Sequence, residues 1–112
     1  RWLGDVYKRQ DQWVNAYDFV GDVRGKGLSI GIDIVSNKQA KTRASEEALK
    51  ICNYCFDHGL VLIAVAGNVL RFQPPLVITY EQLDYALNTI ENALQALQDG
   101  QLDDYNIDGQ GW

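Results

Sequence analysis

Arg71 is the residue whose chemistry contrasts most with its surroundings. It is a single cation within an apolar stretch that runs from Leu60 to Ile78. An arginine is costly to bury unless it meets an anion. Its planar guanidinium suits a carboxylate that accepts two parallel hydrogen bonds. Spacing alone leaves two interpretations open: a structural ion pair or exposed strand position, or a clamp for the carboxylate of a substrate.

Cys52 and Cys55 have the spacing of a redox or zinc pair. A tetrahedral zinc site needs further ligands, and His58 is the one other soft ligand nearby. The two cysteines fall on the apolar face of an expected helix, which favours buried thiols without chemistry. His58 is expected at the end of that helix in a capping or surface role. A Ser/His/Asp or Cys/His catalytic constellation therefore lacks support, and we predict no metal site in this chain.

The glycine-rich segment Gly21–Gly27 reads GDVRGKG. It lacks both the dinucleotide-binding fingerprint and the Gly-Lys-Ser/Thr ending of a phosphate loop. A strand pattern follows it instead of a helix. We expect a bend between two strands, with the turn at 25–27.

The elements that would position these residues follow from periodicity. Alternation predicts a half-buried strand over 28–35 after a short strand over 19–24. Apolar spacing predicts helices after a Ser45 N-cap and after a capping box formed by Thr79 and Gln82. Further strands are expected over 60–65, as a buried apolar run, and over 69–72. The predicted fold class is α+β: a two-layer domain, with a mostly antiparallel sheet and two amphipathic helices on one face.

Composition excludes several classes of protein. The 112 residues suffice for one domain, and 15 acidic against 10 basic residues give a net charge of −5. This balance lacks the basic footprint of a nucleic-acid-binding protein. No apolar run approaches the roughly 18 residues of a membrane span. Two cysteines are too few for a disulfide scaffold, so we expect a cytoplasmic protein.

Residues 1–10 read RWLGDVYKRQ and show neither helical nor alternating periodicity. Asp5–Gln10 resembles the conceptual translation of a transposon-end adapter used in DNA sequencing. We expect residues 1–10 to be a non-native scar, and the chain to be the carboxyl-terminal piece of a longer protein. The alternative is a frayed native end.

Several motifs together resemble a known family. The order is GDVRGKGL at 21–28, Ile-Gly-Ile at 30–32, His-Gly-Leu at 58–60, GNVLRF at 67–72, Pro-Pro-Leu at 74–76, and Thr79 to Leu83. This succession is similar to the carboxyl-terminal small domain of class III aminotransferases of the 4-aminobutyrate and acetylornithine type. Those are pyridoxal-phosphate enzymes of fold type I.

The resemblance implies specific roles. Arg71 matches the arginine that engages the substrate carboxylate, or pairs with a large-domain glutamate when the site is empty. Residues 11–100 would form the small domain and 101–112 a tail. The reactive lysine and most contacts to pyridoxal phosphate would lie in the missing large domain, so this fragment alone should be inactive. The full-length protein is expected as a homodimer. An exposed apolar patch is expected near Arg71 and Gly21–Gly27, where the large domain would pack.

The expected function is that of a transaminase, which moves an amino group between an amino acid or omega-amino acid and a 2-oxo acid. One alternative is an amino-acid racemase or 2-epimerase on the same fold, which the Gln-Pro-Pro run and the tail faintly favour. Another alternative is a stand-alone binding module without catalysis. No nucleic acid and no membrane is expected as a partner.

Overall fold

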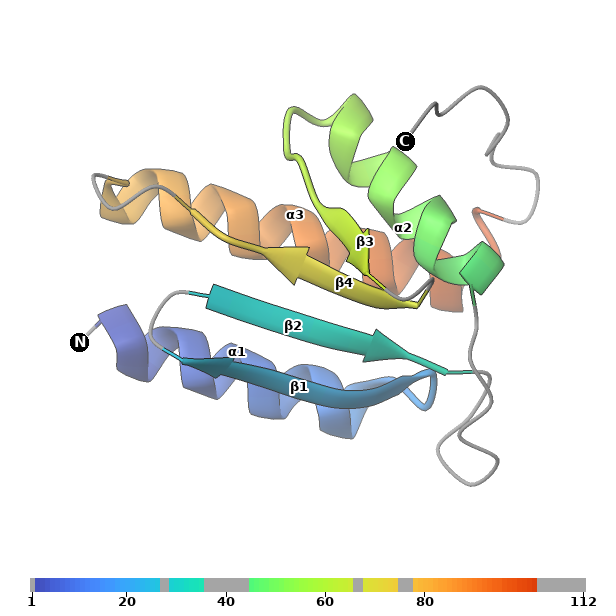
Figure 1. Cartoon of the computed structure of the whole chain (residues 1–112), viewed down its shortest axis with the longest axis horizontal. Coiled ribbons are helices and arrows are strands. Elements are labelled where there is room, and N and C mark those ends of the chain that lie inside the picture. The colour runs from blue at the N-terminus through green and yellow to red at the C-terminus, as the bar shows by residue number, and fades with distance from the viewer. Residues whose placement is uncertain (1, 27–28, 36–44, 66–67, 75–77, 103–112) are drawn as a thin grey trace.

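The computed structural model describes residues 2–26, 29–35, 45–65, 68–74 and 78–102. Helices and strands are mixed along this part of the chain (Figure 1). The elements are α1 (Trp2–Ala16), β1 (Val20–Lys26), β2 (Ser29–Ile34), α2 (Ser45–Asp57), β3 (Ile63–Val65), β4 (Val69–Phe72) and α3 (Tyr80–Gln98).

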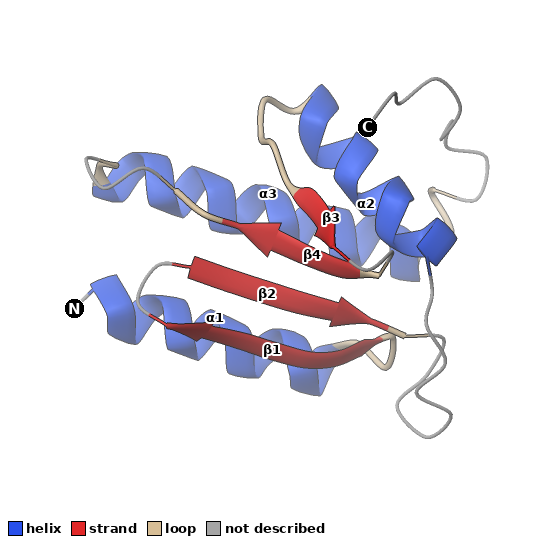
Figure 2. Ribbon diagram, viewed as in Figure 1, coloured by secondary structure: helices blue, strands red, loops and turns tan. Residues whose placement is uncertain are grey.

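The strands form one sheet in the order β1-β2-β4-β3, and each neighbouring pair is antiparallel. The strands on either side of α2, β2 and β3, run in the same direction but are separated by β4. Figure 2 shows α1 and α3 behind the sheet. The helix α2 packs against α3 and the β3 end of the sheet. The α+β, two-layer prediction is confirmed, with three helices in the described residues instead of two.

Period-two alternation places one face of the sheet in the core. Ile30, Ile32 and Ile34 of β2 are buried, as are Leu70 and Phe72 of β4. They belong to the same apolar cluster as the buried residues of all three helices. The helices therefore cover one face of the sheet and leave the other face open.

The last helix begins with the capping box that the sequence predicts. Thr79 accepts a hydrogen bond at its side chain from the Gln82 amide at 3.1 Å, and the Gln82 side chain accepts one from the Thr79 amide at 2.9 Å. Gly100, with a φ of 77°, follows the helix, because glycine adopts the left-handed conformation without steric cost. The helix buries Leu83 and Ile90 against the sheet.

The first ten residues depart from expectation, because Trp2–Ala16 form the helix α1. Val6, Gln10 and Trp13 lie on its buried face, at 0%, 8% and 1% exposure. These positions have helical spacing, but the middle one is a polar glutamine. The apolar stripe is therefore interrupted, and the helical pattern cannot be recognised from the sequence. The prediction that this segment lacks helical periodicity is wrong. Its origin as a sequencing scar stays a prediction.

The run over 60–65 is not a buried strand. Only Ile63–Val65 pair, and they do so with β4 at the edge of the sheet. The side chains of Ile63 and Val65 face away from the helices and are 55% and 41% exposed, while Leu62 is 2% exposed. An apolar run cannot indicate which of its residues face the open side of a sheet.

Two boundaries also differ from expectation. Gly25 and Lys26 pair with Ile30 and Ser29 within the sheet, so they extend β1 instead of forming a turn. Ser45 is the first residue of α2, one position later than an N-cap would stand. Residues 103–112 of the expected tail lie outside the described residues.

Candidate functional site

Arg71 lies on the open face of the sheet, in the middle of β4. Its strand neighbours Leu70 and Phe72 point into the core, so the arginine points the other way and is exposed. Gly31 of β2 lies opposite it on one side and Ile63 of β3 on the other. The guanidinium is therefore bordered by a residue without a side chain and by an exposed apolar one.

Arg71 forms no hydrogen bond or ion pair with any side chain in the described part of the chain. The carboxylate nearest to it along the sheet, Asp33, accepts a hydrogen bond from the Asn68 side chain at 2.6 Å instead. A structural ion pair, one of the interpretations left open by the sequence, is thus not formed among these residues. The cation is available to an external anion.

Exposed apolar side chains border Arg71 on the β3 side. Val61, Ile63 and Val65 are 58%, 55% and 41% exposed. Exposed apolar surface is thus present beside Arg71 as expected, but it lies at the opposite edge of the sheet from Gly21–Gly27, where it was also expected. A cation at the border of such a strip suits a ligand that combines a carboxylate with an apolar body, or a second domain that covers both.

The two cysteines are buried, as predicted. Cys52 is 2% exposed and Cys55 is 0% exposed. Burial raises the pKa of the Cys52 thiol to about 11 and that of the Cys55 thiol to about 12. Both thiols are therefore protonated near neutral pH, and a redox or nucleophilic role would need the thiolate.

His58 has a structural place at the end of α2. Its Nδ1 lies 2.7 Å from the Tyr54 carbonyl oxygen, and its ring stacks on the Tyr54 ring with centroids 4.1 Å apart. The Tyr85 hydroxyl donates a hydrogen bond to the His58 carbonyl at 2.7 Å. The expected capping or surface role is confirmed. The described residues contain no group of three side chains that could hold a metal ion.

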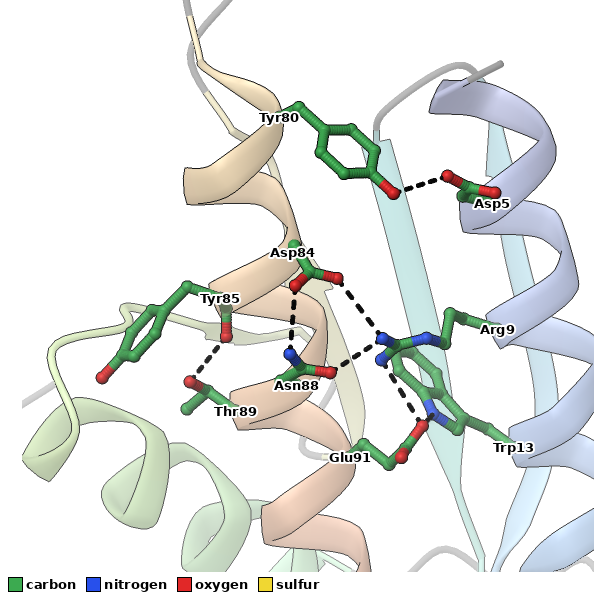
Figure 3. Close-up of polar contacts among 9 residues, drawn as sticks. All are labelled: Asp5, Arg9, Trp13, Tyr80, Asp84, Tyr85, Asn88, Thr89 and Glu91. Atoms are coloured by element: carbon green, nitrogen blue, oxygen red, sulfur yellow. Dashed lines mark hydrogen bonds and ion pairs between the residues drawn. The ribbon is translucent and has the colours of Figure 1, made fainter.

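A polar network between α1 and α3 was not anticipated (Figure 3). Arg9 donates to the Asn88 side-chain oxygen at 2.7 Å and lies 3.5 Å from carboxylate oxygens of Asp84 and Glu91. The Trp13 indole donates to Glu91 at 3.1 Å. These partners are more than 70 residues apart in sequence, so no local sequence pattern could predict that they meet. The network fastens α1 to α3 and does not reach the open face.

The class III aminotransferase family model matches residues 5–94. The chain therefore belongs to the class III aminotransferase family. The match begins inside the first ten residues and includes Arg71 and every described strand.

Individual relatives differ in their reactions. The chain is 42% identical over 87% of its length to a leucine/methionine racemase of Thermococcus litoralis. It is 46% identical over 77% of its length to an isoleucine 2-epimerase of Lentilactobacillus buchneri. It is 37% identical over 70% of its length to an acetylornithine aminotransferase of Clostridium acetobutylicum. The chain spans 22%, 19% and 18% of these three relatives.

Solved structures share the fold. A Bacillus anthracis aminotransferase matches with a TM-score of 0.72 at 29% identity, over 83% of this chain and 22% of that one. An amine transaminase from an uncultivated Pseudomonas species, solved in its PLP-bound form, matches with a TM-score of 0.74 at 26% identity, over 84% and 22%. None of the described helices has the length and apolar character needed to cross a membrane.

Proposed function

We propose that this chain is the part of a pyridoxal-phosphate-dependent enzyme that binds the carboxylate of an amino-acid substrate through Arg71. The observation that carries this proposal is the exposed guanidinium, which has no partner among the described side chains and lies on the helix-free face. Membership of the class III aminotransferase family supports it. Because the chain spans about a fifth of its relatives, the activity belongs to a longer protein.

Pyridoxal phosphate, when bound, serves as the electron sink for chemistry at the amino-bearing carbon. The described residues do not form a site for it. The lysines with described side chains are Lys8 on α1 and Lys50 on α2, and Lys50 is 3.7 Å from Glu46. We therefore propose that pyridoxal phosphate is held by a large domain elsewhere in a longer protein.

The contribution of this chain is binding and orientation. The Arg71 fork can donate two parallel hydrogen bonds to a carboxylate, which fixes both the position and the plane of that group. When Arg71 holds the carboxylate, the amino-bearing end of the substrate is oriented for reaction and no longer has to find its position by diffusion. The exposed strip of Val61, Ile63 and Val65 would exclude water once a second domain covers it.

Racemisation or 2-epimerisation of an apolar amino acid is the reaction that the individual relatives favour. The racemase and the epimerase are 42% and 46% identical to this chain, against 37% for the acetylornithine aminotransferase. The carboxylate clamp serves this reaction without a 2-oxo acid.

Transamination between an amino acid and a 2-oxo acid is the second candidate. The family and the solved neighbours favour it. For either reaction we propose a homodimer with the site at the subunit interface. A cytoplasmic location stays a prediction. A stand-alone binding module would instead require an upstream reading frame without a lysine-bearing domain.

The test uses the full-length protein loaded with pyridoxal phosphate. It is given one enantiomer of leucine or isoleucine without any 2-oxo acid, and the products are separated on a chiral column. The opposite configuration at the amino-bearing carbon indicates racemisation or epimerisation. Turnover that requires a 2-oxo acid indicates transamination.

The carboxylate clamp has its own variant. Arg71→Ala should lower kcat/KM by about a hundredfold, the size of a charge-assisted bidentate pair. Arg71→Lys keeps the positive charge but loses the planar guanidinium. Its kcat/KM should lie between that of the wild type and that of Arg71→Ala. An unchanged kcat/KM in Arg71→Ala would contradict the proposal.

A further inference from the structure

Asp33 and Arg71 project from the same face of neighbouring strands. Gly31 lies opposite Arg71, and Asp33 lies opposite Val69, in the register of β2 and β4. The two charged residues are therefore diagonal neighbours, at a separation of roughly 7 Å that long side chains can bridge. Nothing in the register prevents an ion pair between them.

The Asp33 carboxylate instead accepts a hydrogen bond from Asn68. The Asn68 Nδ2 donates to Asp33 Oδ1 at 2.6 Å and to the Ile34 carbonyl oxygen at 3.0 Å. The Ile34 amide in turn donates to the Asn68 carbonyl oxygen at 3.0 Å. The asparagine is 3% exposed, so its amide group is fixed by backbone and packing. Asp33 is thus held at the end of β2 that lies farther from Arg71.

The strand on the other side of β2 carries both signs of charge. In the register of β1 and β2, Asp22 lies opposite Asp33 and Arg24 lies opposite Gly31. Gly31 is also opposite Arg71, so Asp33 has a diagonal arginine position on each neighbouring strand. A neutral amide donor can hold the carboxylate without adding a charge of its own.

We infer that Asn68 is a positioning residue for Arg71: by holding the Asp33 carboxylate, it keeps the guanidinium free for the carboxylate of the substrate. This inference rests on the proposed function of Arg71 and extends it to a side chain that does not touch the substrate. Without Asn68, Asp33 pairs with Arg71 and competes with the incoming substrate.

The test is a double-mutant cycle in the full-length holoenzyme, with kcat and KM measured for the amino-acid substrate. Asn68→Ala should raise KM about fivefold, the competition expected from an exposed ion pair, and leave kcat nearly unchanged. Asp33→Asn alone should keep the wild-type KM. In the double variant the competing charge is gone, so KM should return to the wild-type value.

A merely structural role for Asn68 gives a different pattern. In that case KM stays raised in the double variant, or kcat falls with it, and the inference is overturned. An unchanged KM in Asn68→Ala overturns it as well. If Asn68→Ala does not fold, Asn68→Ser replaces it in the cycle, since serine keeps a hydroxyl for the Ile34 carbonyl but is too short to hold Asp33. Loss of folding in both variants would also overturn the inference.

Arg71→Ala separates this inference from the proposed function. If Arg71→Ala leaves KM unchanged, the carboxylate clamp itself has failed. If Arg71→Ala raises KM but the Asn68 effect is not rescued by Asp33→Asn, the clamp stands and only the role of Asn68 is lost.

Discussion

Gly31 of β2 lies directly opposite Arg71 of β4 in an antiparallel register. No side chain therefore stands beside the stem of the arginine on that side, and a ligand can approach the guanidinium over the β2 backbone. On the other side Ile63 of β3 is the register partner. The asymmetry gives the cation one open flank and one apolar flank.

Filling the open flank should impair the clamp. In the full-length enzyme we expect Gly31→Val to lower kcat/KM by about tenfold, because a branched side chain crowds the approach to Arg71. The fold should be retained, since valine favours strands. Ser29→Val, two residues along the same face and opposite Lys26, is the matched control. Equal activity of both variants would contradict the open-flank interpretation.

Gln10 should be a point of instability in the chain as it stands. It is 8% exposed, and its Nε2 has no hydrogen-bond partner. Gln10→Leu removes an unsatisfied buried amide and should raise the free energy of unfolding by about 1–2 kcal/mol. Urea denaturation of the 112-residue chain measures this effect.

Gln12→Leu is the matched control for that variant. Gln12 is on the same helix but exposed, so its replacement should change the free energy of unfolding by less than about 0.5 kcal/mol. Equal shifts in the two variants would mean that burial at position 10 is not the cause.

The buried thiols should be unreactive and should make stability fall at high pH. Burial raises the pKa of the Cys52 thiol to about 11 and that of the Cys55 thiol to about 12, from an ordinary value of 9.0. The folded state therefore holds protons that the unfolded state releases above pH 9, so stability is lost as pH rises through that window. Labelling by a maleimide at pH 8 should be at least about a hundredfold slower in the folded chain than in urea. Rapid labelling of the folded chain would contradict burial.

The capping box at the start of α3 should contribute measurably to stability. Thr79→Ala removes the acceptor for the Gln82 amide and should cost about 1 kcal/mol of unfolding free energy. Thr79→Ser keeps the hydroxyl and is the matched control. The midpoint of thermal unfolding followed by circular dichroism reports both, and an unaltered midpoint in Thr79→Ala would show that the cap is dispensable.

The parts of the fold that sequence could predict are those set by local periodicity. The alternation around Ile32 and the spacing around Leu87 fix which side of each element is buried, wherever the element lies. The Thr79 and Gln82 pair and Gly100 are short-range signals in the same sense. Burial of Cys52 followed from its place on a helical stripe.

Sequence could not predict features that depend on strand order. The edge position of β3 follows from β4 lying between β2 and β3, which no local pattern encodes. The same holds for the hydrogen bond between Asn68 and Asp33, since it exists only because β4 pairs with β2. Of the candidate site, sequence reasoning named Arg71, whose role stays a prediction, and it did not name the residues that lie beside it in the sheet.

The short edge strand β3 has a practical consequence for anyone who expresses this chain. In the described residues its backbone pairs only with β4, so its outer amides and carbonyls offer a template for another copy. Two valines and an isoleucine on or beside it are exposed, and no charged residue interrupts them over 61–65. Strand edges of this kind promote aggregation unless they are covered. A lysine at position 63 would be a rational first choice for keeping the isolated polypeptide monomeric at the concentrations that spectroscopy requires.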